Sequence, residues 1–306
     1  KVGTGIETLT GANTYTGGTF ITAGTLAIGP GGSLAATGAV TLSAAGTGFD
    51  ISTAGANQTI GSLNGVAGST VSLGAQTLTL GGVGNSLFDG AISGTGGLVK
   101  SGASSLTLNG ANTFGGGVAF NAGSLVLGNG GALGTGGLNV DGVVSLDTSA
   151  ALAVGNGITL GAGGSLNVLG SNALTLGGAI GGTGSLVKNG AATLTLGGAN
   201  TFTGGLAINA GKVAVGSGGS LAAGGAVSLA GVGADLDISL GGNQTIGALS
   251  GIAGSTVTLG SSTLTFGDAT NQTFAGVIGG TGGLVKDGAA TVTLSGANTY
   301  TGGTTI

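Results

Sequence analysis

Aliphatic and small polar residues alternate along this chain in short runs. Residues 77–80, 193–196 and 291–294 each place a threonine before every aliphatic residue. Successive side chains of a strand point to opposite faces, so this alternation predicts strands with one buried face. The runs last four to six residues, and none has the 3.6-residue apolar spacing of a helix. The pattern therefore predicts an all-β protein made of many short strands.

Glycine separates the runs and predicts sharp corners between the strands. The 306 residues include 77 glycines but one proline, Pro30, and the glycines follow no Gly-X-Y period, which excludes collagen. Glycine and asparagine tolerate positive φ values at tight corners. The mean hydropathy is +0.58, yet polar residues or glycine interrupt every apolar run, so we expect no membrane-spanning helix.

A phrase that recurs four times divides the chain into repeats. Gly-Ala-Asn-Thr, followed by tyrosine or phenylalanine, begins at Gly11, Gly110, Gly198 and Gly296, at intervals of 99, 88 and 98 residues. A lysine stands ten residues before each copy, at Lys1, Lys100, Lys188 and Lys286. We therefore expect one β-solenoid fragment over 1–306, with repeats at 1–99, 100–187 and 188–285 and the start of a fourth at 286–306. Because the chain opens on lysine without a signal-like segment, we expect an interior piece of a longer protein.

Similar strands recur at intervals of about 20 residues within each repeat. The strands starting at 173 and 193 are 20 residues apart, whereas those starting at 77 and 105, and at 263 and 291, are 28 apart. The extra eight residues lie at 83–90 and 269–276, and the second repeat lacks them. This spacing predicts stacked turns, about four per repeat with five as the alternative. Roughly 13 turns would make a rod on the order of 60 Å long, and a β-propeller-like repeat is the alternative fold.

The residue types that are missing exclude several functions. With no histidine or cysteine, the chain contains neither a Ser-His-Asp nor a Cys-His triad, nor a thiolate zinc site. Five lysines, no arginine and a net charge of −4 disfavour nucleic acid as a partner. We assign no catalytic, cofactor-binding or metal-binding residue, expect no cofactor and predict that the chain is not an enzyme.

The polar positions that recur once per repeat are expected to support the scaffold. The lysines are predicted to cap strand ends, and the asparagines of the phrase to form turns and bonds between turns, at Asn13, Asn112, Asn200 and Asn298. An aligned aspartate, at Asp50, Asp147 and Asp237, is predicted to face solvent. Asp235 and Asp237 have the i, i+2 spacing that could suit paired-carboxylate glycoside chemistry, although the scaffold role is favoured. Three Asn-Gln-Thr glycosylation sequons, at Asn57, Asn243 and Asn271, are likewise expected to bond between turns.

The recurring phrases resemble a known repeat. Gly-Thr-Gly-Gly-Leu-Val-Lys, Thr-Leu-Thr-Leu, Gly-Ala-Asn-Thr-Tyr-Thr-Gly-Gly-Thr and Asn-Ala-Gly-Lys-Val-Ala-Val-Gly are together similar to the autotransporter-associated β-strand repeat of bacterial type V passenger regions. Matching stretches are 1–29, 94–128, 182–216 and 280–306. The resemblance implies a right-handed parallel β-helix, exported through an outer membrane and displayed on, or released from, a Gram-negative bacterium. That repeat is scaffold and has no catalytic residues.

These observations predict a non-enzymatic extracellular scaffold. We expect a stalk, fibre or surface-layer rod that supports adhesion or biofilm formation. The alternatives are a carbohydrate-active β-helix enzyme and an ice-binding solenoid, which would need a carboxylate cluster and a continuous threonine array. The expected partners are further copies, associating end to end or laterally, or further repeats, together with cell-surface or glycan contacts.

Overall fold

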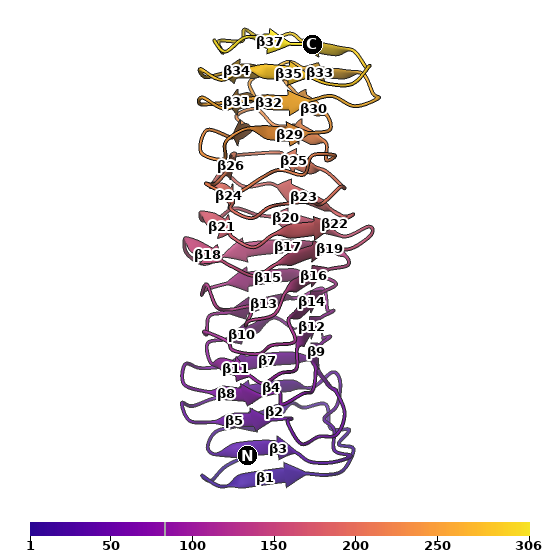
Figure 1. Ribbon diagram of the computed structural model, residues 1–306. Coiled ribbons are helices and arrows are strands. Elements are labelled where there is room, and N and C mark those ends of the chain that lie inside the picture. The colour runs from indigo at the N-terminus through magenta and orange to yellow at the C-terminus, as the bar shows by residue number, and fades with distance from the viewer. Residues whose placement is uncertain (83) are drawn as a thin grey trace. The chain divides into compact units, whose positions relative to one another are not determined.

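The computed structural model describes residues 1–82 and 84–306, and these residues form strands and no helix. The strands pair in parallel with strands of the turns before and after them. The chain divides into two compact units, an N-terminal unit (Lys1–Ser149) and a C-terminal unit (Ala150–Ile306). Each unit is a β-solenoid whose successive turns lie one above another (Figure 1). The predicted all-β solenoid is confirmed, and the β-propeller alternative is wrong.

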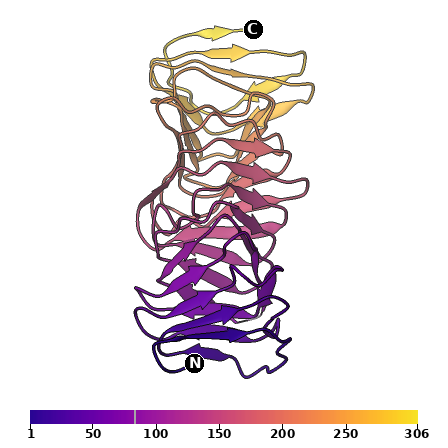
Figure 2. The same ribbon diagram turned by 60° about the horizontal axis from the view of Figure 1, so that its bottom comes forward.

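Three parallel sheets form the sides of the N-terminal unit, and Figure 2 shows their strands stacked along it. Sheet 1 contains β1 (Ile6–Leu9), β3 (Thr25–Ile28), β5 (Gly48–Asp50), β8 (Thr70–Ser72) and β11 (Ala91–Ser93). Sheet 2 contains β6 (Gln58–Ile60), β9 (Leu78–Leu80), β12 (Leu98–Lys100), β14 (Val118–Phe120) and β16 (Leu138–Val140). Sheet 3 contains β2 (Thr19–Ile21), β4 (Ala39–Leu42), β7 (Ser62–Gly65), β10 (Ser86–Phe88), β13 (Ser105–Leu108), β15 (Ser124–Leu127) and β17 (Val143–Thr148).

The C-terminal unit repeats this arrangement. Its sheet 1 contains β18 (Leu152–Val154), β21 (Leu174–Leu176), β24 (Leu194–Leu196), β26 (Lys212–Val215), β28 (Asp235–Asp237), β31 (Thr256–Thr258) and β34 (Val277–Gly279). Its sheet 2 is in two parts, β19 (Ile158–Leu160) with β22 (Ile180–Gly182), and β29 (Gln244–Ile246), β32 (Leu264–Phe266), β35 (Leu284–Lys286) and β37 (Thr304–Thr305). Its sheet 3 contains β20 (Ser165–Val168), β23 (Ser185–Lys188), β25 (Leu206–Ile208), β27 (Val227–Leu229), β30 (Leu249–Gly251), β33 (Gln272–Phe274) and β36 (Val292–Leu294).

Each turn passes through sheets 1, 2 and 3 in that order, and some turns cross one side without a regular strand. The Gly-Ala-Asn-Thr phrase always lies on such a side. Its first copy, for example, connects β1 of sheet 1 to β2 of sheet 3 and so takes the place of a sheet 2 strand. The chain makes about 15 turns rather than the expected 13, because a repeat of 98 or 99 residues contains more than four turns.

The eight-residue segment that the second repeat lacks forms one side of a turn. Residues 173 and 193 immediately precede β21 and β24, which are neighbouring strands of sheet 1. The 20-residue interval between them is therefore one turn. The strands starting near 77 and 105 are β9 of sheet 2 and β13 of sheet 3. The 28-residue interval between them therefore covers one complete turn and one further side of the solenoid. The extra segments, 83–90 and 269–276, contain β10 and β33 respectively. Val83 lies outside the described residues. From the first repeat to the second, the strand after the lysine therefore moves from sheet 1 (β1) to sheet 3 (β13).

Aliphatic side chains stacked in register form the core. Leu106, Leu125 and Leu146 occupy the same inward position in three successive strands of sheet 3, and each is fully buried. Where a phenylalanine takes such a position, the turn before it supplies space. Phe88 pairs in register with Gly65, and a Cβ on that glycine would lie 2.5 Å from the phenyl ring. Alternating burial thus follows the sequence pattern, and glycine adjusts it where a ring must fit.

Candidate functional site

Three of the four repeat lysines bridge adjacent turns. In each of the first three, the ammonium group donates to a carbonyl two residues ahead in its own turn and to another 22 residues ahead in the next turn. Lys188 bonds Gly190 and Ala210 in this way, and Lys286 bonds Gly288 at 2.7 Å. Lys100 and Lys188 are 2% and 0% exposed. Burial lowers the pKa of both ammonium groups. The hydrogen bonds of each lysine join two turns at a corner of the solenoid.

The lowered pKa of Lys188 predicts a pH dependence of stability. Because its pKa lies below the ordinary value of 10.5 in the folded state, the unfolded chain binds more protons between these two values. The free energy of unfolding should therefore rise as the pH increases toward 10.5. In a Lys188→Met variant this contribution is absent, so the stability difference between wild type and variant should grow in favour of the wild type from pH 7.5 to pH 10. Urea denaturation at both pH values measures it, and parallel pH profiles would contradict the assignment.

The asparagine of the phrase joins three consecutive turns. The Oδ1 atom of Asn200 accepts a hydrogen bond from the backbone N–H of Ile180 at 3.0 Å, one turn earlier, and its Nδ2 donates to the carbonyl of Ser220 at 2.7 Å, one turn later. Asn112 makes the same pair of bonds, to Ile92 and Ala132. Asn298 accepts from Ile278, and Asn13 donates to Ser33. The side-chain amide thus supplies the inter-turn bonding that a regular strand would provide with its backbone.

The aligned aspartates lie on three different strands and are all half-buried. Asp50 and Asp237 each accept a hydrogen bond from the backbone N–H two residues ahead, Ser52 and Ser239 respectively. Asp147 accepts one from the N–H of Thr148. Each aspartate therefore binds a backbone N–H at or just beyond the last residue of its strand, and the three lie on separate strands.

A charged cluster on sheet 1 of the C-terminal unit contains the Asp235–Asp237 pair. The Lys212 ammonium lies 3.1 Å from a carboxylate oxygen of Asp235 and 2.9 Å from one of Asp237. Thr256 and Thr258 donate to the other oxygen of Asp235. Partial burial alone would raise the pKa of Asp237, but hydrogen bonds from Ser239 and Lys212 outweigh it and hold this pKa below its usual value. An ionised, bridged carboxylate is unlike the protonated acid that glycoside cleavage needs.

Lys212 is the residue of this cluster that the sequence analysis did not single out. It occupies the position of Thr25 in the first repeat, and Asp235 occupies that of Gly48. Both pairs are register partners in neighbouring strands of sheet 1. A neutral pair in one repeat is thus replaced by an ion pair in another. Comparing charges between aligned repeats would have revealed it without a structure.

The asparagines of the three sequons are exposed and bond to the next turn. The Oδ1 atoms of Asn57, Asn243 and Asn271 accept hydrogen bonds of 2.8–2.9 Å from the backbone N–H exactly one turn, or 20 residues, ahead. Asn85, which is in no sequon, accepts the same kind of bond from Ser105. Because the same hydrogen bond forms inside and outside a sequon, it supports the prediction that these asparagines bond between turns.

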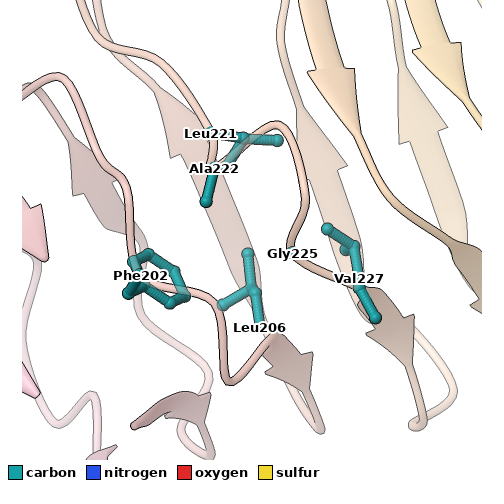
Figure 3. A pocket seen from close by; sticks show the side chains of 7 residues that line it. Phe202, Leu206, Leu221, Ala222, Gly225 and Val227 are labelled. Carbon is teal, nitrogen blue, oxygen red and sulfur yellow. The ribbon is translucent and has the colours of Figure 1, made fainter. Parts of the chain in front are cut away.

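A small apolar hollow lies between the turns of the third repeat (Figure 3). Phe202, Leu206, Leu221, Ala222 and Val227 line it, and its volume of about 10 Å³ leaves space for little more than one water molecule. Across residues 1–82 and 84–306 no cluster of three or more acidic residues is close enough to hold a metal ion. The same residues contain no helix that is long and apolar enough to cross a membrane.

The recurring segments coincide with matches to a known repeat. The family model of the passenger-associated-transport-repeat matches residues 1–28, 98–127, 186–215 and 284–306. Comparison with curated proteins and with solved structures gives no match. The four matched segments contain the repeat lysines and the Gly-Ala-Asn-Thr phrases, whose contacts hold successive turns together. The chain is therefore a β-solenoid that contains four passenger-associated-transport-repeats, which matches the resemblance to an autotransporter passenger repeat.

Proposed function

We propose that this chain is a non-enzymatic extracellular scaffold, displayed at the surface of a Gram-negative bacterium or released from it. It would serve as a stalk, fibre or surface-layer rod that supports adhesion or biofilm formation. The proposal rests on what the recurring polar residues bond to. The lysines and asparagines that recur in every repeat bond to backbone groups of neighbouring turns, so their recurrence is explained by stacking.

The passenger repeat supports the location, because passengers are exported to the cell surface. The two alternative functions find less support. The Asp235–Asp237 pair is bridged by a lysine. The outward residues of sheet 3 in the C-terminal unit include Val187, Ala207 and Ser228 in register, so threonine does not continue from turn to turn there as an ice-binding array requires. Self-association of copies, end to end or laterally, stays a prediction of the scaffold model.

Surface labelling and attachment assays test this proposal. An antibody raised against the chain should label intact cells of the producing bacterium or detect the chain in the medium, and deleting the gene should reduce attachment to a solid surface. Complementation with the wild-type gene should restore attachment, and a variant with a disrupted solenoid should not. Detection of the chain only after cell lysis, or unchanged attachment in the deletion strain, would contradict the proposal.

A further inference from the structure

The outer face of sheet 3 in the N-terminal unit carries exposed apolar side chains among hydroxyl and amide groups. Phe20, Thr41, Asn64 and Leu87 follow one another in register on β2, β4, β7 and β10. Phe20 is 59% exposed and Leu87 is 49% exposed. The other seven phenylalanines of the chain are buried, so the exposed ring of Phe20 makes this face a candidate for contact with a ligand.

An open hollow of about 300 Å³ lies beside Phe20. Phe20 and Ala39 form its apolar part, the side chains of Thr16, Thr37 and Ser62 contribute hydroxyl groups, and glycines lie between them. Ser62 is only 7% exposed, and its hydroxyl has no hydrogen-bond partner in the described part of the chain. This hydroxyl, like those of Thr16 and Thr37, lies in the wall of the hollow and can donate a hydrogen bond to a ligand or accept one from it.

A second hollow, of about 350 Å³, lies along the opposite ends of the same strands. Thr41, Ser43, Asn64, Val66 and Leu87 line it. The Oδ1 atom of Asn64 accepts a hydrogen bond from the N–H of Leu87 at 3.1 Å, whereas its Nδ2 group has no partner among the described residues. The second hollow thus repeats the combination of the first, an apolar side chain next to free polar groups.

The chemistry of the two hollows points to one class of ligand. A sugar ring has an apolar C–H face that packs on an aromatic ring and a rim of hydroxyls that both donate and accept hydrogen bonds. The hollows contain no cation to attract an anionic ligand, and Asp89, which lines the second, would repel one. Neighbouring strands are about 4.8 Å apart, close to the length of one sugar residue, so successive sugars of a polymer would lie over successive turns.

We propose that this face binds a neutral polysaccharide, with one sugar ring packed on Phe20 and the hydroxyls of this sugar and its neighbours in the polymer bonded to Thr37 and Ser62. The inference rests on the proposed function, because it names the ligand class through which a surface-displayed scaffold would adhere. A stable protein–protein interface would instead need a continuous apolar centre, and the polar Thr41 and Asn64 separate the two exposed apolar residues of this face.

Affinity electrophoresis of the intact chain tests the proposal. Native gels would contain dextran, yeast mannan or hydroxyethyl cellulose as neutral probes, and polygalacturonate as the charged comparator. At least one neutral polymer should retard the wild type. Phe20→Ala should weaken that retardation about five- to tenfold, as loss of an aromatic contact does, and Ser62→Ala should weaken it at least twofold. Leu240→Ala, which removes another exposed apolar side chain (74% exposed) from the other unit, should leave it unchanged.

Three results would overturn the inference: no retardation by any neutral polymer, retardation by polygalacturonate alone, or retardation that Phe20→Ala does not alter. Circular dichroism and thermal unfolding of each variant show that a loss of binding is not a loss of fold. Sedimentation velocity tests a further outcome. If the wild type self-associates and Phe20→Ala does not, this face is an interface between copies, and the inference is overturned. If no neutral polysaccharide binds but the antibody still labels intact cells, this inference is overturned and the proposed function stands.

Discussion

Replacement of Gly198 by alanine is expected to destabilise the C-terminal unit by about 3 kcal/mol or more. Gly198 begins the third Gly-Ala-Asn-Thr phrase and is buried against the turn before it. A Cβ at this position would lie 2.5 Å from the carbonyl carbon of Gly178 and 2.7 Å from the nitrogen of Ala179. Both are backbone atoms, which cannot move aside without separating the two turns, so the added methyl group disrupts their stacking.

Gly11 provides the matched control, because it begins the first copy of the same phrase. A Cβ there would meet no atom within 4 Å, so Gly11→Ala should leave stability unchanged or raise it by up to about 1 kcal/mol through the reduced entropy of the unfolded chain. Urea denaturation followed by circular dichroism measures both variants, and hydrogen exchange with peptide-level resolution assigns the change to a unit. Equal effects at the two glycines would refute the explanation by close contact.

Replacement of Asn200 by alanine is expected to cost about 3 kcal/mol. Asn200 is 3% exposed, and its side chain makes hydrogen bonds to Ile180, Gly198 and Ser220. The alanine variant leaves the N–H of Ile180 buried without an acceptor, which costs more than the net value of an ordinary hydrogen bond. The shorter side chain also opens space between turns on a side that has no strand to close it.

The same substitution at Asn298 distinguishes the effect of losing the hydrogen bond from the effect of burial. Asn298 accepts an equivalent hydrogen bond from Ile278 at 2.9 Å but is only half-buried. Water can replace the lost acceptor there, so Asn298→Ala should cost about 1 kcal/mol. Hydrogen exchange should show faster exchange at the Ile180 amide in Asn200→Ala. A larger loss of stability at Asn298 than at Asn200 would contradict this account.

Both predictions assign a physical task to the phrase by which the repeats are recognised. Its glycine admits the backbone of the turn before, and its asparagine bonds the turns before and after. The lysine ten residues earlier braces the next turn at a corner. These residues recur because each repeat must cross one side of the solenoid without a strand, and the same polar contacts then replace the missing backbone ladder. We expect contacts with other molecules at the outward positions, which differ between repeats.

Several contacts of the site residues are not visible in any single stretch of the chain. The i, i+2 spacing of Asp235 and Asp237 was visible, but the ammonium group of Lys212 that neutralises them lies more than 20 residues away in sequence. The hollow beside Phe20 is also assembled from four successive turns. Such residues meet only because turns stack, and their separation in the chain depends on the length of every turn between them.

The sequence by itself determined the class of fold and the length of a turn. Alternation of period two requires strands with one buried face, glycine permits the corners, and strands about 20 residues apart in near-identical repeats require stacked turns. Only the tertiary structure decided which side of the solenoid each phrase occupies and which side chains the wall encloses. The physical reason is that position around the solenoid accumulates from turn to turn. One eight-residue segment, such as that containing β10, moves everything after it by a full side, so the strand that follows the lysine lies in sheet 1 in the first repeat (β1) and in sheet 3 in the second (β13).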